Sequence, residues 1–206
     1  MIWEQQFIDQ VLPILIQGQG RATTAQLQSQ GITAQELDPL VAHQVLAKSA
    51  PDTYILSEPL VDIDVLVLAH WAVPSAIVGG LTALVYRSFS VAQLVALDLF
   101  VLDGVAIPDR IGDMAVRRHV LPPQLLAYGV TSLTPSLPGS VAVPMFTPAI
   151  ALAQILSDAI TPEETCQDAV LAYLAEYDRD QNLTDALSRY GVTPTRIDQL
   201  VAATVR

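Results

Sequence analysis

Apolar residues run without a charge from Val65 to Tyr86, a stretch of 22 residues that must be buried in protein or in lipid. It is long enough to cross a bilayer, but Pro74, Ser75 and the Gly79–Gly80 pair interrupt it. A spanning helix would favour Leu, Ile and Val at such positions. The pattern therefore predicts two buried elements of a soluble core, and a membrane span is the less favoured alternative.

The two elements meet near Pro74, which would break a continuous helix. The first is predicted as a helix over Val61–Trp71, because Asp62 and Asp64 fall in its opening turn, where the helix dipole favours carboxylates. The second runs from the two glycines into a helix that ends near Arg87.

Periodicity and cap residues predict two helices before residue 32. Met1–Gln17 carries a helical apolar stripe, and Pro13 marks a kink or a boundary in it. A short helix follows the caps Thr23 and Thr24 and stops at Gly31.

A third helix and a hairpin follow. The helix begins at Thr33, where Glu36 completes a capping box, although Pro39 predicts that it is kinked or begins late. The hairpin has its turn at Ser49–Asp52 and its second strand at Thr53–Leu56. This order is typical of a winged helix-turn-helix, whose third helix is presented to the major groove.

Polar side chains on these elements are the candidate DNA contacts. The charges of the third helix are Glu36 and Asp38, so Arg21 and Lys48 are the candidates for phosphate binding. A winged helix used for packing or partner contact is therefore an equally open interpretation. The candidate DNA-binding residues are Arg21, Thr23, Thr33, Gln35, His43, Gln44, Lys48 and Tyr54.

The second half predicts a small sheet followed by helices. The sheet is expected to be mixed or mostly antiparallel, with strands at Leu94–Leu102, Met114–Leu121, Tyr128–Leu133 and Val141–Phe146. Helices are expected after three Thr-Pro pairs, in which a cap precedes a first-turn proline: Thr147–Pro148, Thr161–Pro162 and Thr193–Pro194.

Two further helix signals lie near the end of the chain. Thr161 and Glu164 predict a capping box for a helix that buries one stripe, formed by Cys166, Val170, Tyr173, Leu174 and Tyr177. Asn182 and Asp185 open another short helix, which Gly191 closes. The fold class is therefore α+β, with a winged helix-turn-helix at residues 1–58, an α+β domain at 59–160 and a helical segment at 161–206.

Composition narrows the function. The chain of 206 residues has a net charge of −11, with one lysine and nine arginines, which argues against a non-specific nucleic-acid binder. The negative charge either attracts a basic partner or keeps a very apolar protein soluble. Cys166 is the single cysteine, so no internal disulfide forms. The N-terminus has no basic leader and no apolar signal core, which predicts a cytoplasmic protein.

Catalytic and cofactor motifs are absent from the sequence: it has no phosphate loop, dinucleotide fingerprint, HExxH or nucleophile elbow. His43, His70 and His119 have no ligand at metal-binding spacing. Asp62 and Asp64 would share a face in a strand and hold a cation, but at a helix start they are caps. We expect no enzyme, no cofactor and no metal.

Four arginines form a candidate basic patch of the second domain: Arg87, Arg110, Arg117 and Arg118. Asp103, Asp109 and Asp113 lie nearby in the sequence. Pairing between these carboxylates and the arginines is the favoured interpretation, and exposed pairs of this kind contribute little to stability.

Taken in order, the segments resemble the AbiEi family, the antitoxin half of abortive-infection type IV toxin-antitoxin systems. GRATTAQLQSQGITAQELDPLVAHQVL with APDTYIL resembles the family's winged helix and wing, and VPSAIVGGLTALVY its strand and helix. The segment VRRHVLPPQLLAYGVTSLTPSLPGSVAVPMFTPAIALAQILSD is similar to its strands and following helix, and DQNLTDALSRYGVTPTRIDQL to its closing helices.

The resemblance implies a transcriptional regulator in antiviral defence that binds repeats upstream of its own operon. It also implies that the C-terminal domain counteracts a nucleotidyltransferase-like toxin. The implied partners are operator DNA, a cognate toxin or other basic protein, and a second copy in a homodimer, with no membrane. The wing here lacks the family's arginine, so an acidic protein-interaction module that has lost DNA binding is the alternative.

Overall fold

A computed structural model of the chain describes residues 7–18, 21–43, 45–56, 64–135 and 142–203. The chain forms two compact units of mixed helix and strand, and its fold class is α+β. Unit 1 consists of residues 1–75, 107–114 and 134–141. Unit 2 consists of residues 76–106, 115–133 and 142–206.

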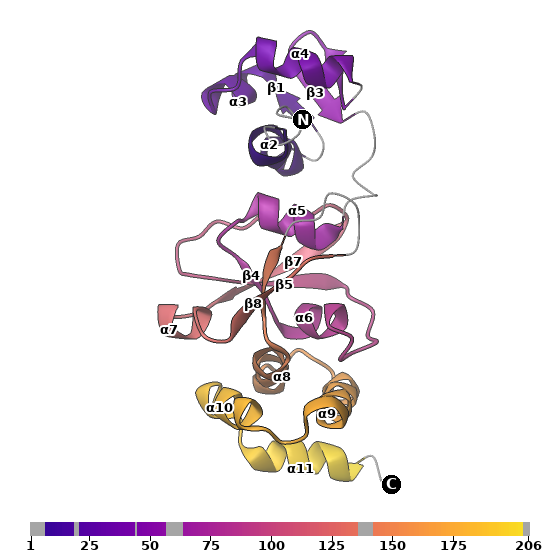
Figure 1. Cartoon of the computed structure of the whole chain (residues 1–206), viewed down its shortest axis with the longest axis vertical. Coiled ribbons are helices and arrows are strands. Elements are labelled where there is room, and N and C mark those ends of the chain that lie inside the picture. The colour runs from indigo at the N-terminus through magenta and orange to yellow at the C-terminus, as the bar shows by residue number, and fades with distance from the viewer. Residues whose placement is uncertain (1–6, 19–20, 44, 57–63, 136–141, 204–206) are drawn as a thin grey trace. The chain divides into compact units, whose positions relative to one another are not determined.

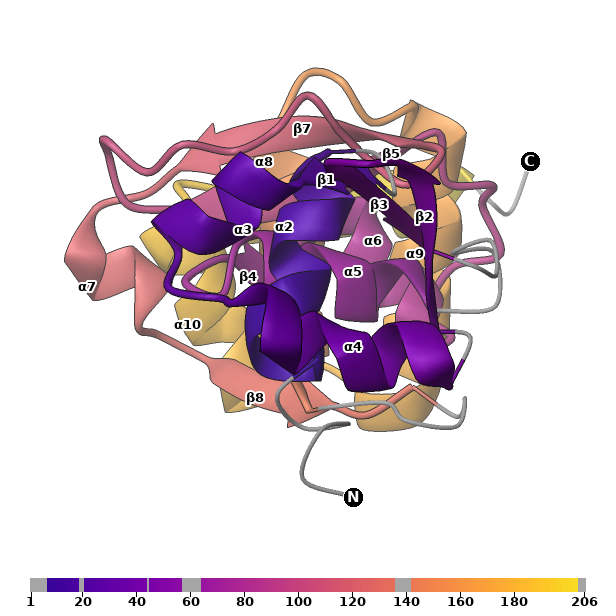
Figure 2. The same ribbon diagram turned by 90° about the horizontal axis from the view of Figure 1, so that it is seen from above.

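Unit 1 begins with three helices and a three-stranded sheet, shown in Figure 2. The strands are antiparallel in the order β1-β3-β2, so the sequence-predicted hairpin β2–β3 is present and β1 adds a third strand to it. The elements are a π-helix at Phe7–Val11, α2 (Leu12–Gln17), β1 (Arg21–Thr23), α3 (Thr24–Ser29), α4 (Ala34–Ala42), β2 (Leu46–Ala50) and β3 (Thr53–Leu56).

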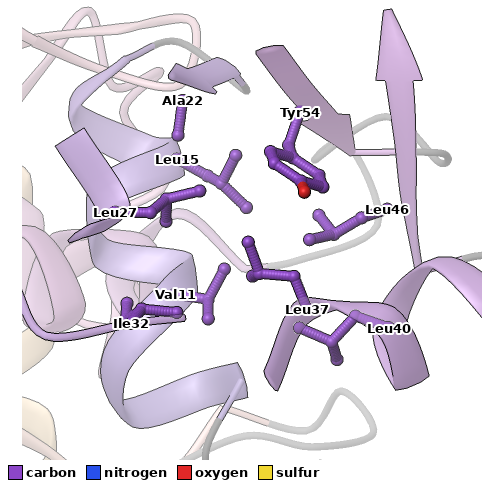
Figure 3. Close-up of a cluster of buried hydrophobic side chains, with 9 residues drawn as sticks. All are labelled: Val11, Leu15, Ala22, Leu27, Ile32, Leu37, Leu40, Leu46 and Tyr54. Atoms are coloured by element: carbon purple, nitrogen blue, oxygen red, sulfur yellow. The ribbon is translucent and has the colours of Figure 1, made fainter. Parts of the chain in front are cut away.

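Figure 3 shows the apolar cluster that joins these elements. Each contributes at least one side chain that is at most 2% exposed. Leu15 of α2 and Leu27 of α3 meet Leu37 of α4 and Tyr54 of β3. Burying such side chains stabilises each by about 1.5–3 kcal/mol, so this cluster fixes α4 against the hairpin.

Caps explain where α3 and α4 begin. The Gln26 side chain accepts from the Thr23 N–H (2.8 Å), and the Glu36 side chain from the Thr33 N–H (2.7 Å), so the expected Thr33 capping box is confirmed. The alternative that α4 begins late is wrong, because it starts at Ala34 with Pro39 inside it. The box satisfies the first turn, and one proline removes one hydrogen bond from a short helix.

The uncharged run Val65–Tyr86 is divided between the units. In unit 1 it forms α5 (Val65–Ala72), whose N-cap is Asp64; Asp62 lies outside the described residues. A two-residue strand, β6 (Arg110–Ile111), also belongs to unit 1. Within the described residues, no helix is long and apolar enough to cross a membrane.

Unit 2 is built on a mixed sheet with the strand order β7-β5-β4-β9-β8. The β5–β7 and β4–β9 pairs are parallel, and the β4–β5 and β8–β9 pairs are antiparallel. The strands are β4 (Ile77–Val78), β5 (Ala96–Val101), β7 (Met114–Val120, whose first residue belongs to unit 1), β8 (Val130–Leu133) and β9 (Val143–Phe146). The four strands predicted from sequence are confirmed, and β4 corresponds to the short strand that the family resemblance implies before the Gly79–Gly80 pair.

Helices of unit 2 pack in layers beyond the sheet, with α8 contacting α6, α9 and α10, and α11 packing on α9 (Figure 1). Their bounds are α6 (Gly80–Tyr86), α7 (Pro123–Leu126), α8 (Pro148–Ser157), α9 (Glu163–Tyr177), α10 (Gln181–Arg189) and α11 (Pro194–Ala203). Thr147 is the N-cap of α8, as expected.

Two details of the C-terminal helices correct the expectation. The Thr161–Glu164 capping box does not form: α9 begins at Glu163 after Pro162, and the Thr161 N–H donates to Asp158 Oδ1 (2.8 Å). Asp158 therefore replaces Glu164 as the partner of Thr161. Tyr177 is 46% exposed and Leu174 is half-buried, so the buried stripe of α9 ends at Tyr173.

Candidate functional site

The outer side of α4 is the surface that a winged helix would present to DNA. Gln35, Glu36 and Asp38 are exposed there, and Leu37 and Leu40 point into the core. Gly31, with a φ of +81°, forms the turn between α3 and α4, where a residue with a Cβ would be strained. Core packing therefore fixes the position of α4, but the charged side chains that it exposes are negative.

Register separates the two cations expected to bind phosphate. Residues opposite one another in an antiparallel pair point to the same face of the sheet. Ala22 and Lys48 lie opposite Tyr54, and Arg21 lies opposite Ile55. Because Tyr54 points into the core under α4, Lys48 lies on the α4 side and Arg21 on the other side.

The remaining DNA-binding candidates divide into three groups. Tyr54 is a correction: it is 2% exposed and Lys48 Nζ lies 5.3 Å from its ring centre, so it packs the core instead of reaching a nucleic acid. Thr23 and Thr33 cap α3 and α4, and exposed His43 ends α4. Gln44 lies outside the described residues.

The four arginines of the candidate basic patch have different environments. Arg118 lies 3.9 Å from the Asp103 carboxylate, so the expected pairing is confirmed at this position. Arg110 donates instead to the backbone carbonyl of Asp113. Arg87 Nε and Nη2 are buried with no hydrogen-bond partner among the described residues. Burial lowers the pKa of the Arg87 guanidinium.

Arg117 belongs to a buried polar centre that sequence reasoning did not predict. Asp98 of β5 has a side chain only 4% exposed, and its Oδ1 accepts from Arg117 Nη1 at 3.1 Å. His119 Nε2 lies 2.9 Å from the same oxygen. The parallel register places Asp98 beside Arg117 and Phe100 beside His119, and the Phe100 and His119 rings stack at 4.3 Å.

The start of α6 closes this centre from the other side. The Asp98 N–H donates to Thr82 Oγ1 (2.9 Å), and the Gly80 N–H donates to Gln154 Oε1 (2.8 Å). Gly80 has a φ of +52°, and a Cβ on it would lie 3.2 Å from the Asp98 carboxylate. The Gly79–Gly80 pair is therefore required for the close approach of α6 to β5.

The contacts of Asp98 define what the centre can do. A carboxylate beside a histidine orients the imidazole, as in many general bases. The Thr82 hydroxyl, however, contacts Asp98 and not the imidazole, so the described residues do not assemble a nucleophile–base–carboxylate series. The centre joins β5, β7 and α6 through an ion pair whose carboxylate is buried.

The sequence contains one indication of the polar centre around Asp98. Asp98 is the single charge within the apolar strand LVALDLFVL, and Arg117 and His119 alternate along the next strand. A lone carboxylate in a buried strand requires a partner. Which partner it takes depends on the parallel pairing of β5 with β7, which a pattern along one segment does not reveal.

Histidines and acids of the described residues do not gather into a metal site: no group of three or more has suitable geometry there. His70 of α5 has a buried Nδ1 without a partner in the described part of the chain, and burial lowers the pKa of its imidazole. His70 is therefore a partly buried residue whose imidazole is neutral at physiological pH.

Comparisons with known proteins give a distant likeness. No family model matches the chain, and no curated protein matches it. Among solved structures, the chain is similar to the RV2827C protein from Mycobacterium tuberculosis, with 16% sequence identity and a TM-score of 0.41. The likeness covers 98% of this chain and 81% of that one.

Proposed function

We propose that the chain is an antitoxin-type transcriptional regulator whose helix α4 enters the major groove of its operator. One observation supports this most directly: α3 and α4 form a helix-turn-helix around Gly31 that shares one core with the hairpin β2–β3. This is the arrangement that places a recognition helix beside a wing. The resemblance to the AbiEi family supports the antitoxin part and a nucleotidyltransferase-like toxin as the protein partner.

Few phosphate contacts support the DNA complex. Between residues 21 and 56 the described cations are Arg21 and Lys48, and Lys48 alone shares the α4 side of the sheet. One contact per chain gives a salt slope near −1, and two chains on repeated half-sites give about −2. Binding as a homodimer on repeats therefore offsets the weak electrostatics of one chain.

Titration of a labelled duplex from the chain's own upstream region tests the proposal. Fluorescence anisotropy at several salt concentrations is expected to show saturable binding with this shallow slope. Lys48→Ala should reduce the magnitude of the slope by about 1 per bound chain. Arg21→Ala is the matched control, because it removes a cation on the other face and should leave the slope unchanged. No saturable binding at low salt would refute the DNA-binding function.

The alternative function is a protein-interaction module on the same fold. It is favoured by the exposed carboxylates of α4, Glu36 and Asp38, and by Asp52 at the hairpin turn, which suit a basic protein better than phosphates. Co-purification with the product of the adjacent gene, together with no DNA binding, would select this alternative. Rescue of growth when the chain is co-expressed with that product would support the antitoxin role in either case.

A further inference from the structure

A pocket of about 410 Å³ in unit 2 has no role in the DNA-binding function. Three of the chain's six tyrosines line it: Tyr128, Tyr173 and Tyr177. The rest of the lining is Gly129, Thr147, the first turn of α8, Asp180 and Asn182. The volume suits one long side chain or a small molecule.

The aromatic wall is held in place from behind. The ring centres of Tyr173 and Tyr177 are 5.2 Å apart. Phe89, which is 9% exposed, lies 6.0 Å from Tyr173 and 5.7 Å from Tyr177. Tyr177 is nevertheless 46% exposed, so its ring is open to a ligand. A preformed aromatic wall favours apolar stems and cations, because the ring face carries negative charge.

Asp180 is the single formal charge among the lining residues. Its carboxylate accepts from the Leu183 N–H at 2.8 Å and from the Tyr173 hydroxyl at 3.0 Å. Burial alone would raise its pKa, but these bonds and one from Asn182 hold the pKa below its ordinary value. The carboxylate is therefore ionised at neutral pH and makes the pocket anionic.

The nearby arginines do not neutralise the Asp180 carboxylate, so its charge is available to a ligand. Arg179 is paired with Asp198 (2.6 Å), and Arg87 and Arg189 do not line the pocket. Arg189 places its guanidinium 3.7 Å from the Tyr128 ring centre, so a guanidinium already stacks on one lining ring. The N-terminus of α8 carries only about half a positive charge, against the full negative charge of Asp180.

We propose that this tyrosine pocket binds an arginine side chain of a basic protein partner, with the stem on Tyr177 and the guanidinium facing Asp180. Arginine is favoured over lysine because its planar group stacks on rings and bonds a carboxylate at the same time. The net charge of −11 suits such a partner. The proposal rests on the proposed function only for the partner's identity as the toxin.

NMR titration of the full chain with N-acetyl-arginine amide tests the pocket, using the tyrosine ring signals. N-acetyl-citrulline amide is the matched neutral probe, and inorganic phosphate is the anionic one. Arginine amide should shift the Tyr177 signals saturably and bind at least tenfold more tightly than citrulline amide. Equal binding of the two amides, no binding of either, or a stronger response to phosphate would each overturn the proposal.

Variants locate the contact. Asp180→Asn keeps the cap of α10, since Asn caps helices as well as Asp, and should weaken arginine-amide binding about fivefold to tenfold. Asp185→Asn lies in the same helix outside the lining and should bind as the wild type does. Tyr177→Leu should abolish co-purification with the toxin while operator binding is unchanged. Absence of operator binding by the wild-type chain, with arginine-amide binding retained, would therefore count against the DNA-binding function and not against the pocket.

Discussion

Replacing Asp98 with alanine tests whether the buried centre stabilises unit 2. The change removes the acceptor of Arg117, His119 and Thr82 at once. Breaking a buried ion pair costs roughly 3–5 kcal/mol when the remaining charge is uncompensated. Arg117 is 28% exposed and can be partly hydrated, which places the loss near the lower limit, at about 3 kcal/mol.

Urea unfolding followed by circular dichroism measures this loss as a change in the free energy of unfolding. In thermal unfolding of a chain of this length, about 3 kcal/mol corresponds to a fall in Tm of roughly 6–12 °C. Asp103→Ala is the control: the Asp103 side chain is 95% exposed and 3.9 Å from Arg118, so its loss should change stability by less than about 0.5 kcal/mol. Equal effects of the two substitutions would refute the assigned role of the Asp98 centre.

Two further predictions concern unit 2. Gly80→Ala should destabilise by about 1–3 kcal/mol in the same assay, from its positive φ and the contact with Asp98; Gly104→Ala, with a φ of +79° and open space around it, should cost less. Burial raises the pKa of the Cys166 thiol to about 11, so a disulfide reagent at pH 8 should label it only after unfolding. Stability should fall as pH rises from about 9 towards 11, because the unfolded thiol ionises first; labelling as fast as a free thiol would contradict this.

Local signals predicted much of the fold. The Thr33–Glu36 capping box and the Thr147–Pro148 pair placed the starts of α4 and α8, because caps act within one turn of the chain. Runs of β-branched and aliphatic residues of the length of a strand predicted β5 and β7. The same reasoning divided the run Val65–Tyr86 at Pro74, where α5 has ended.

The features missed from sequence depend on distant partners. β1 is three residues long, and it is a strand because β3 pairs with it. The sequence pattern predicts Tyr54 as a DNA contact, but Tyr54 lies opposite Ala22 on the core face of the sheet and is buried. The Asp98 centre and the tyrosine pocket join residues far apart in the chain, whose meeting depends on tertiary packing.

The operator affinity of the Asp38→Asn variant tests most directly whether α4 faces DNA. The variant is expected to bind more tightly, whereas damage to the fold could only weaken binding. Asp38 is exposed on α4, and removing one charge near the phosphates should strengthen binding about fivefold, or about 1 kcal/mol. Asp168→Asn, an exposed carboxylate on α9, is the matched control and should have no effect. Anisotropy titrations with the upstream duplex should show tighter binding for Asp38→Asn alone, and identical affinities for both variants and the wild type would contradict the account.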